Sequence, residues 1–275
     1  MKRTAAFLLA GVVVAALSLV AGGTAEANQL EEIKKKGVLV VGVKTDYPPW
    51  GMRDPSGAIV GMEPDMAADV AKRLGVKVEV VSVVSSNRMQ FLQQGKIDLM
   101  IATMSDTAER RKVVGIVDPV YYASGVAIMA NKKSNIKSAA DLKGKPVCAL
   151  QGAFYNNELQ SKYTGQDLVA FKGIPETEQA LLDGRCVGFV YDDVVLVWKK
   201  AQEKKWDGFE VVALPEWTPV PWGLAVKIEE LNQPWGKFMS ATLKDWLKSG
   251  TLVALEKKWV GSNTKWLLEA TEKAK

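Results

Sequence analysis

Short apolar segments of four to six residues alternate along the chain with segments whose apolar positions recur every three or four residues. The first pattern is typical of buried strands and the second of helices with one buried face. The segment Pro64–Leu74 is an example, because its apolar residues fit one helical face and Gly75 then stops the helix. The first part of the chain is therefore expected to contain the strand Val38–Val43, the helix Pro64–Leu74, the strand Val76–Val81, the helix Arg88–Gln94 and the strand Ile97–Ala102.

A second unit repeats this alternation further along the chain. It is expected to contain the strand Val147–Leu150, the helix Tyr155–Tyr163, the strand Leu168–Phe171, the helix Glu176–Leu182 and the strand Val187–Tyr191. Alternating strands and helices indicate an α/β protein, so we expect two lobes, each a mostly parallel sheet flanked by helices. The last part of the chain is expected to add the strands Glu210–Ala213 and Trp222–Lys227 and the helices Asn232–Lys248 and Thr251–Trp259.

Two connections between the lobes are expected, one at residues 121–125 and one at the proline-rich residues 214–221. The chain would then pass from one lobe to the other twice. Lobe one would comprise residues 28–123 and 221–275, and lobe two would comprise residues 124–220.

The first 27 residues have the features of an export signal. Lys2 and Arg3 precede an apolar run at residues 5–21, and Ala25 and Ala27 form an A-x-A cleavage site. We expect cleavage after Ala27 and a periplasmic mature protein. A retained membrane anchor is the alternative.

The composition excludes several classes of function. The chain has 36 Lys or Arg residues and 31 Asp or Glu residues, and no histidine. Its lysines are dispersed rather than interleaved with aromatic residues, so we expect no nucleic-acid partner. Without histidine, Ser-His-Asp catalysis, Cys-His catalysis and most zinc sites are excluded, and we expect neither a metal nor a cofactor.

The chain has two cysteines, Cys148 and Cys186, and both fall in or beside expected strands. In an oxidising compartment a disulfide between them is favoured over two buried thiols.

Polar residues follow the last strand of each unit. The first strand leads to Thr103, Ser105 and Arg110, and the second leads to Asp192. Ligands of open α/β sheets bind at the carboxyl ends of strands, so these side chains are expected to face each other across a cleft. A guanidinium grips a carboxylate and an aspartate receives an ammonium group, so the pair suits an amino-acid zwitterion. A surface arginine and a helix-capping aspartate are the alternatives.

Five segments in this order resemble the polar amino-acid periplasmic solute-binding proteins of ABC importers (solute-binding protein family 3). They are GVKTDYPPW (Gly42–Trp50), GMEPDMAADVAKRLG (Gly61–Gly75), NRMQFLQQGKIDLMIATMSDTAERR (Asn87–Arg111), DPVYYASG (Asp118–Gly125) and GRCVGFVYDD (Gly184–Asp193). The resemblance implies a type II periplasmic-binding-protein fold with two hinge crossings. It also implies a monomer that captures an amino acid and docks on an inner-membrane ABC permease.

The resemblance assigns roles to the polar residues at the strand ends. Arg110 matches the arginine that clamps the ligand α-carboxylate, with help from Ser105 and from the backbone around Thr103. Asp192 matches the carboxylate that receives the α-ammonium group.

The resemblance also points to residues near the ligand side chain. Tyr47 and Trp50 match an aromatic stretch in which one ring lies against the ligand, although Trp50 fits core packing equally well. The pair Asn87 and Arg88 resembles that of the subgroup that binds glutamate, aspartate or many amino acids, and Lys44 falls where that subgroup can carry another cation. An acidic ligand is favoured if both cations point inward. If Arg88 pairs with a carboxylate on its own helix instead, its presence does not indicate which amino acid is bound.

One segment departs from the family pattern. The family often has Gly-Thr-Thr where residues 151–155 read QGAFY. Gly152 keeps its match, but the threonine hydroxyls are lost and Phe154 is expected to make the pocket more apolar.

Two other functions are compatible with this fold. One is an enzyme similar to cyclohexadienyl dehydratases, for which Glu158 is the only candidate acid; the other is a ligand-binding component for a chemoreceptor. An acid catalyst needs a raised pKa in the cleft, and Glu158 is expected on a solvated helix face instead. We therefore expect a binding protein and not an enzyme.

Overall fold

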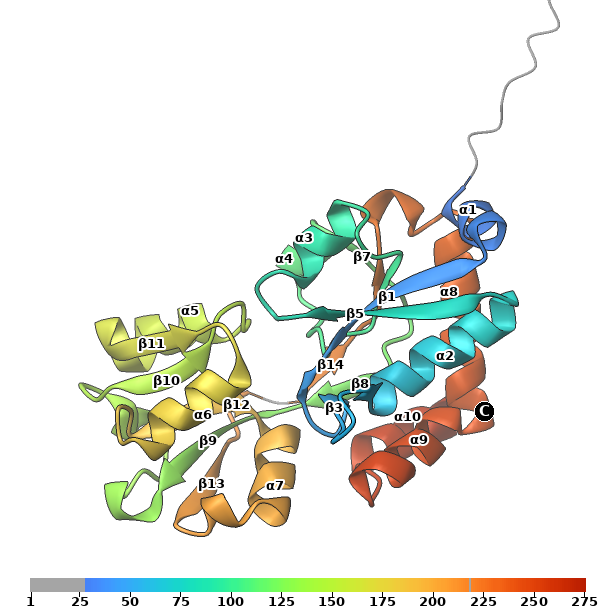
Figure 1. Ribbon diagram of the computed structural model, residues 1–275. Coiled ribbons are helices and arrows are strands. Elements are labelled where there is room, and N and C mark those ends of the chain that lie inside the picture. The colour runs from blue at the N-terminus through green and yellow to red at the C-terminus, as the bar shows by residue number, and fades with distance from the viewer. Residues whose placement is uncertain (1–27, 218) are drawn as a thin grey trace, which may run out of the picture.

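The computed structural model describes residues 28–217 and 219–275, which form two α/β lobes (Figure 1). The expected export signal, its cleavage site after Ala27 and the alternative of a retained anchor lie outside the described residues. Within the described residues, no helix is long and apolar enough to cross a membrane.

The sheet of lobe one has the strand order β5-β1-β6-β15-β7. Strands β5, β1 and β6 are parallel, and β15 pairs antiparallel with both β6 and β7. Four strands of this sheet therefore point one way and only β15 runs against them. The bounds are β1 (Val38–Lys44), β5 (Lys77–Val83), β6 (Leu99–Met100), β7 (Gly115–Ile116) and β15 (Ala225–Val226).

The sheet of lobe two repeats this plan in the order β11-β10-β12-β9-β13. Strands β11, β10 and β12 are parallel, and β9 pairs antiparallel with β12 and β13. In both lobes the fourth strand of the order is the reversed one, so each sheet is mostly parallel, as expected. The bounds are β9 (Val126–Asn131), β10 (Val147–Leu150), β11 (Leu168–Phe171), β12 (Gly188–Asp192) and β13 (Phe209–Leu214).

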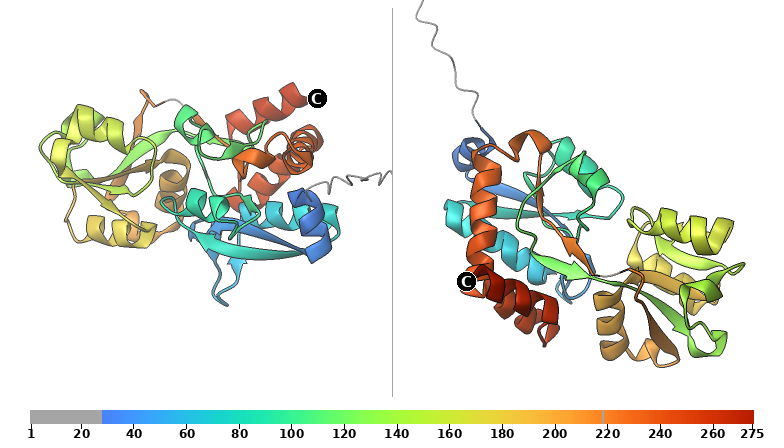
Figure 2. Two further views of the ribbon diagram at one scale, coloured as in Figure 1. Left: turned by 90° about the horizontal axis from the view of Figure 1, so that it is seen from above. Right: turned by 180° about the vertical axis from the view of Figure 1, so that it is seen from behind.

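Helices flank both sheets (Figures 1 and 2). Those of lobe one are α1 (Gln29–Lys36), α2 (Met62–Leu74), α3 (Arg88–Gln93), α4 (Ala108–Arg111), α8 (Pro234–Ser249), α9 (Thr251–Val260) and α10 (Lys265–Ala274). Those of lobe two are α5 (Asn156–Leu159), α6 (Ile174–Leu182) and α7 (Asp193–Gln202). The carboxyl-terminal helix α10 was not expected.

Two antiparallel segments join the lobes. Strand β8 (Tyr122–Ser124) pairs with β14 (Val220–Trp222), with Ala123 opposite Pro221. Both expected lobe boundaries, after residue 123 and after residue 220, fall in this two-stranded ribbon. A small sheet of β2 (Asp46–Tyr47), β3 (Gly51–Arg53) and β4 (Ile59–Val60) lies beside it in lobe one (Figure 1).

Three expected elements differ from the observed ones. The strand expected at 97–102 is only Leu99–Met100, because the backbone at residues 102 and 103 bonds to buried side chains instead of a neighbouring strand. The strand expected at 222–227 is divided, since Trp222 pairs with the ribbon and only residues 225–226 join the sheet. The helix expected at 155–163 consists of α5 followed by a π-helical turn at residues 160–164.

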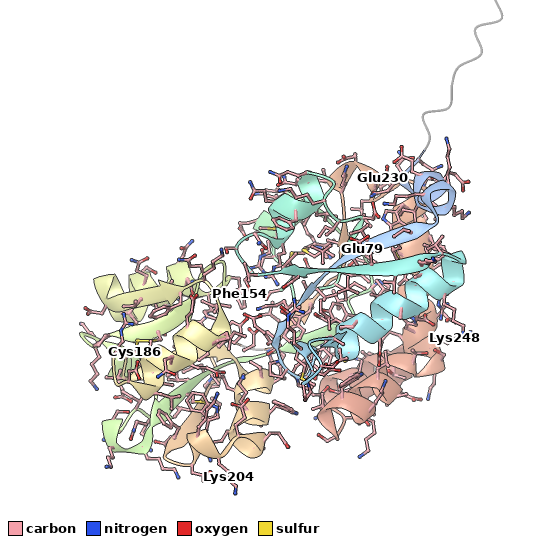
Figure 3. The ribbon with its side chains drawn as sticks, viewed as in Figure 1. Glu79, Phe154, Cys186, Lys204, Glu230 and Lys248 are labelled. Carbon is pink, nitrogen blue, oxygen red and sulfur yellow. A yellow bond between two sulfur atoms is a disulfide. The ribbon has the colours of Figure 1, made fainter. Side chains whose placement is uncertain are left out.

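Each lobe has a buried core, and the core of lobe two contains the expected disulfide. Cys148 in β10 and Cys186 just before β12 are bonded and nearly inaccessible. Figure 3 shows Cys186 in lobe two, on the side away from lobe one. The disulfide ties two elements of one lobe together and leaves the joint between the lobes free.

Candidate ligand-binding site

A small cleft lies between the two lobes. Its walls nearly meet, and the space left between them is about that of one water molecule. Lobe one contributes Ser85, Arg88, Thr103, Ser105 and Arg110, and lobe two contributes Ala153, Phe154, Tyr155, Tyr191 and Asp192. Phe154 is seen in Figure 3 on the part of lobe two that faces lobe one.

Arg110 reaches the cleft from the short helix α4, whose first turn is capped by the side chain of Thr107. Its guanidinium donates to the carbonyl of Ser105 at 2.9 Å and, across the cleft, to the carbonyl of Gly152 at 2.8 Å. Burial, and then repulsion from Arg88, lower the pKa of Arg110 below its usual value. The group is thus a buried cation, held by neutral partners, that gains from an anion in the cleft.

Asp192 reaches the same cleft from the end of β12 in lobe two. Its Oδ2 accepts a hydrogen bond of 2.6 Å from the hydroxyl of Tyr47 in lobe one, and it makes no side-chain bond to the helix that follows. The alternative of a simple helix cap is therefore wrong. Burial raises the pKa of Asp192 to about 6, although the Tyr47 hydrogen bond and the Lys44 charge lower it.

Arg88 is also buried against the cleft. Its Nη1 donates to the backbone carbonyls of Ala102 and, at 3.0 Å, of Thr103. Among the described residues its Nε has no hydrogen-bond partner and its guanidinium makes no ion pair, so the pairing with a carboxylate on its own helix is wrong.

Lys44 contacts residues that line the cleft but does not line it. Its fully buried Nζ donates to the hydroxyls of Tyr191 at 2.8 Å and Ser85 at 3.2 Å, and it lies 3.8 Å from a carboxylate oxygen of Asp46. Burial lowers the pKa of Lys44. Lys44 thus bridges the lobes beside the cleft.

The two aromatic candidates both belong to an aromatic cluster beside the joint. The rings of Tyr47 and Trp50 are 5.6 Å apart, and each also packs against Trp222. Trp50 is fully buried and does not line the cleft, so its position is that of a core residue. The Tyr47 ring is equally buried, and its hydroxyl is the part that reaches the site.

The backbone brings the lobes close together at Gly152. This residue has φ +81°, and a Cβ at this position would lie only 2.8 Å from the backbone of Ser85 in lobe one. Thr103 on the opposite side has φ +44°, which is uncommon for a residue with a side chain. Its amide donates to Glu63 at 2.7 Å and to the Tyr121 hydroxyl at 3.1 Å.

Comparison with known proteins gives the family. The profile of the bacterial extracellular solute-binding proteins, family 3, matches residues 39–262. The chain belongs to this family. The glutamine-binding protein GlnH of an ABC transporter from Bacillus subtilis (strain 168) is 32% identical over 238 residues, which cover 85% of either chain.

Solved structures of this family share the fold. A mutant of ArgBP from T. maritima superposes with a TM-score of 0.77 at 29% identity, over 85% of this chain and 100% of that one. The ancestral amino acid-binding protein AncCDT-1, a precursor of cyclohexadienyl dehydratase, gives 0.75 at 30% identity over the same shares. The expected two-lobed, type II fold of this solute-binding protein is thereby confirmed.

Four polar residues of the site were not predicted. Ser85, Tyr155 and Tyr191 line the cleft, and Glu63 bonds to the backbone of Thr103 from beneath. Burial raises the pKa of Glu63 to about 7, although the hydrogen bonds from Tyr121 and Thr103 lower it. Tyr191 stands next to Asp192, so its place at a strand end was an available signal.

Glu158, the expected candidate for an acid catalyst, lies outside the cleft. It accepts hydrogen bonds from Lys162 at 2.7 Å and from the indole of Trp217 at 3.1 Å, and these bonds lower its pKa. A lowered pKa is the opposite of what a general acid needs. The solute-binding protein also has no group of three or more possible metal ligands within residues 28–217 and 219–275.

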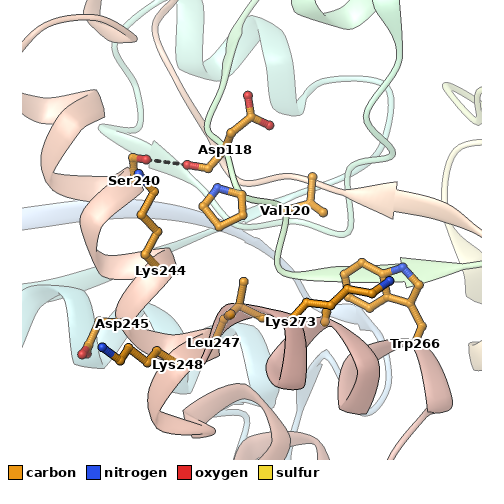
Figure 4. A pocket seen from close by; sticks show the side chains of 12 residues that line it. Asp118, Val120, Ser240, Lys244, Asp245, Leu247, Lys248, Trp266 and Lys273 are labelled. Carbon is orange, nitrogen blue, oxygen red and sulfur yellow. Dashed lines mark hydrogen bonds between the residues drawn. The ribbon is translucent and has the colours of Figure 1, made fainter.

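A larger groove of lobe one is not the candidate site. It lies between α8, α10 and the loop at Asp118, with lysines around an apolar floor (Figure 4). Its residues come from lobe one alone, so it does not lie between the lobes.

Proposed function

We propose that this solute-binding protein captures an α-amino acid in the cleft between its lobes and delivers it to an inner-membrane ABC permease by hinge closure. The observation that carries this proposal is that Arg110 of lobe one and Asp192 of lobe two line one cleft. A bound zwitterion would neutralise both buried charges at once, so it would stabilise the closed form.

Each end of the ligand has a partner in this proposal. The α-carboxylate would take the guanidinium of Arg110, together with Ser105 and the backbone around Thr103, while the α-ammonium group would take Asp192. Gly152 would allow the loop of lobe two to approach the carboxylate. An affinity near micromolar corresponds to about −8 kcal/mol.

We further propose a polar or acidic ligand side chain, with L-glutamate as the first candidate. Support comes from Arg88, a buried guanidinium beside the cleft with an unpartnered Nε and no ion pair among the described residues. A ligand carboxylate or amide oxygen near Arg88 would supply the missing acceptor. Phe154 would form an apolar wall, and Lys44 would act through Tyr191 and Ser85.

We also propose that the protein works as a monomer in the periplasm and delivers its bound amino acid from there to the permease. The family is one of extracellular solute-binding proteins, and the B. subtilis relative is a binding protein of an ABC transporter. These names support a permease as the partner of the loaded, closed form.

A thermal-shift screen of the twenty amino acids, followed by calorimetry on the best ones, tests this function. We expect one-to-one binding of at least one amino acid, with L-glutamate or L-glutamine among the strongest. Binding of no amino acid at millimolar concentration would contradict the proposal.

A dehydratase on the same fold is the second candidate, because AncCDT-1 is a precursor of cyclohexadienyl dehydratase. Asp192, whose pKa is raised to about 6, is then the carboxyl group to examine in place of Glu158. Phenylpyruvate formed from prephenate by the wild type, and not by Asp192→Asn, would favour the enzyme.

A further inference from the structure

The first turn of α6 in lobe two lacks a capping side chain from its own lobe. The residue at the cap position is Gly173, and no side chain there bonds to the helix amides. The first amides of a helix have no acceptor within that helix, and in α6 the second residue, Pro175, has no N–H at all. For α6, the amide of Ile174 is one of these donors.

A carboxylate from the other lobe takes this position. Oδ2 of Asp46, in β2 of lobe one, accepts the hydrogen bond of the Ile174 amide at 3.1 Å. A negative charge at a helix N-terminus is favourable, because the helix dipole and the free amides both attract it. The contact joins residues 128 positions apart in sequence and exists only while the lobes are together.

The same short segment of lobe one makes two further contacts with lobe two. Lys44 donates to Tyr191 at 2.8 Å, and Tyr47 donates to Asp192 at 2.6 Å. Lys44 also lies 3.8 Å from Oδ1 of Asp46, which accepts no hydrogen bond among the described residues. Lys44 therefore keeps the Asp46 carboxylate near α6 through Oδ1, while Oδ2 accepts the amide of Ile174.

We propose that Asp46 is a positioning residue for closure: it caps α6 across the cleft and slows the escape of the bound ligand. This inference rests on the proposed function, in which the ligand leaves by reopening of the hinge. Asp46 does not line the cleft, so its loss should change how long the lobes stay closed rather than which groups the ligand meets.

The test compares Asp46→Ala, Asp46→Asn and the control Asp141→Ala by stopped-flow release of L-glutamate. Asp46→Ala should speed dissociation about tenfold and leave association nearly unchanged, because a charged hydrogen bond to a helix terminus is lost. Asp46→Asn keeps an oxygen acceptor, so its dissociation should be about threefold faster or less. Asp141→Ala should not change the rate, because Asp141 accepts the amides of Lys137 and Ser138 within lobe two.

Wild-type dissociation from Asp46→Ala, or equal acceleration by Asp141→Ala, would overturn the proposal. A wild type that binds no L-glutamate would count against the proposed ligand, and the same release measurement with the amino acid that the thermal-shift screen selects then decides on Asp46 separately. Faster release from Asp46→Ala than from the wild type and Asp141→Ala supports the cap across the cleft. Equal rates overturn it.

Discussion

The hydroxyl of Tyr47 lies 2.6 Å from a carboxylate oxygen of Asp192, although the two residues belong to different lobes. The aspartate proposed to receive the ligand ammonium is therefore held by a donor from the opposite side of the cleft. Burial favours the protonated form of this carboxyl, and the tyrosine hydrogen bond favours the ionised form. The Tyr47 hydrogen bond therefore favours the charged form of Asp192, which is the form that the proposed ligand needs.

Tyr47→Phe should weaken amino-acid binding about tenfold at neutral pH, because hydrogen bonds to charged groups contribute about 1.5–3 kcal/mol. It should also move the pH midpoint of binding upward, since the pKa of Asp192 rises when the donor is lost. Calorimetry between pH 5 and pH 8 measures both effects. Tyr122→Phe is the matched control, because it removes a similar 2.6 Å bond to Glu256 within lobe one. A shift of the pH midpoint in the control as well would contradict this role of Tyr47.

In the wild type, affinity should fall as the pH drops through about 6, the value to which burial raises the pKa of Asp192. Protonation removes the charge that meets the ligand ammonium. Below this pH the dissociation constant should rise about tenfold per pH unit, and above pH 7 it should be nearly constant. The variant Asp192→Asn should bind the amino acid weakly, and its dissociation constant should depend much less on pH. A wild-type affinity that does not change between pH 5 and pH 8 would exclude Asp192 as the ammonium partner.

Glu63→Gln should make the protein less sensitive to alkaline pH. The pKa of Glu63 is raised by burial from 4.5 to about 7 in the folded state. Its stabilising contribution is therefore full below about pH 4.5 and is lost as the pH rises through about 7. Glutamine keeps an acceptor for Thr103 and Tyr121 and carries no charge, so the variant should match or exceed the wild type at pH 8–9, by up to about 3 kcal/mol.

Denaturant unfolding of both proteins at pH 5, 7 and 9 measures this difference. The control is Glu256→Gln, which also alters a buried, hydrogen-bonded carboxyl of lobe one. The role given to Glu63 would be rejected if Glu63→Gln lost stability equally at all three pH values.

Removing the disulfide should destabilise the fold without changing the site. Cys148 and Cys186 are 38 positions apart, and opening a loop of this length costs about 4 kcal/mol in the chain-entropy model. Urea unfolding of the double variant Cys148→Ala/Cys186→Ala should show this loss. At low urea its ligand affinity should stay within about twofold of the wild type, because the bond lies within lobe two and away from the cleft; a large loss of affinity would contradict this separation.

The residues at strand ends could be predicted because their position depends on local sequence. Asp192 ends the buried strand β12 and Arg110 lies shortly after the buried strand β6, and the carboxyl edge of a mostly parallel sheet is where polar groups meet a ligand. The reversed fourth strand of each sheet, and the division of residues 222–227 between ribbon and sheet, depend on pairing with distant segments. No local pattern contains that information.

The positions of Glu63 and Trp50 relative to the site could not be predicted from the sequence, because tertiary packing determines both. Glu63 stands in the first turn of α2, where an acidic residue is ordinary, and its role arises only when the backbone of Thr103 folds onto it. Trp50 stands near Tyr47 in one aromatic stretch, and tertiary packing alone decides that the tyrosine hydroxyl reaches the site while the indole packs against Tyr122 and Trp222.

The central claim is that Arg110 and Asp192 hold the two ends of one amino acid. Calorimetry of Arg110→Ala beside Arg111→Ala tests it most directly. Arg111 is the adjacent cation, but it pairs with Asp106 at 2.6 Å and Asp118 at 2.8 Å on the surface.

Arg110→Ala should lose about 2–5 kcal/mol of binding free energy, because the ligand carboxylate is left buried without its partner. That loss weakens the binding of a micromolar ligand by about 30-fold to 5,000-fold, while circular dichroism should show a folded protein. Arg111→Ala should bind as the wild type does. Wild-type affinity in a folded Arg110→Ala protein would contradict the account.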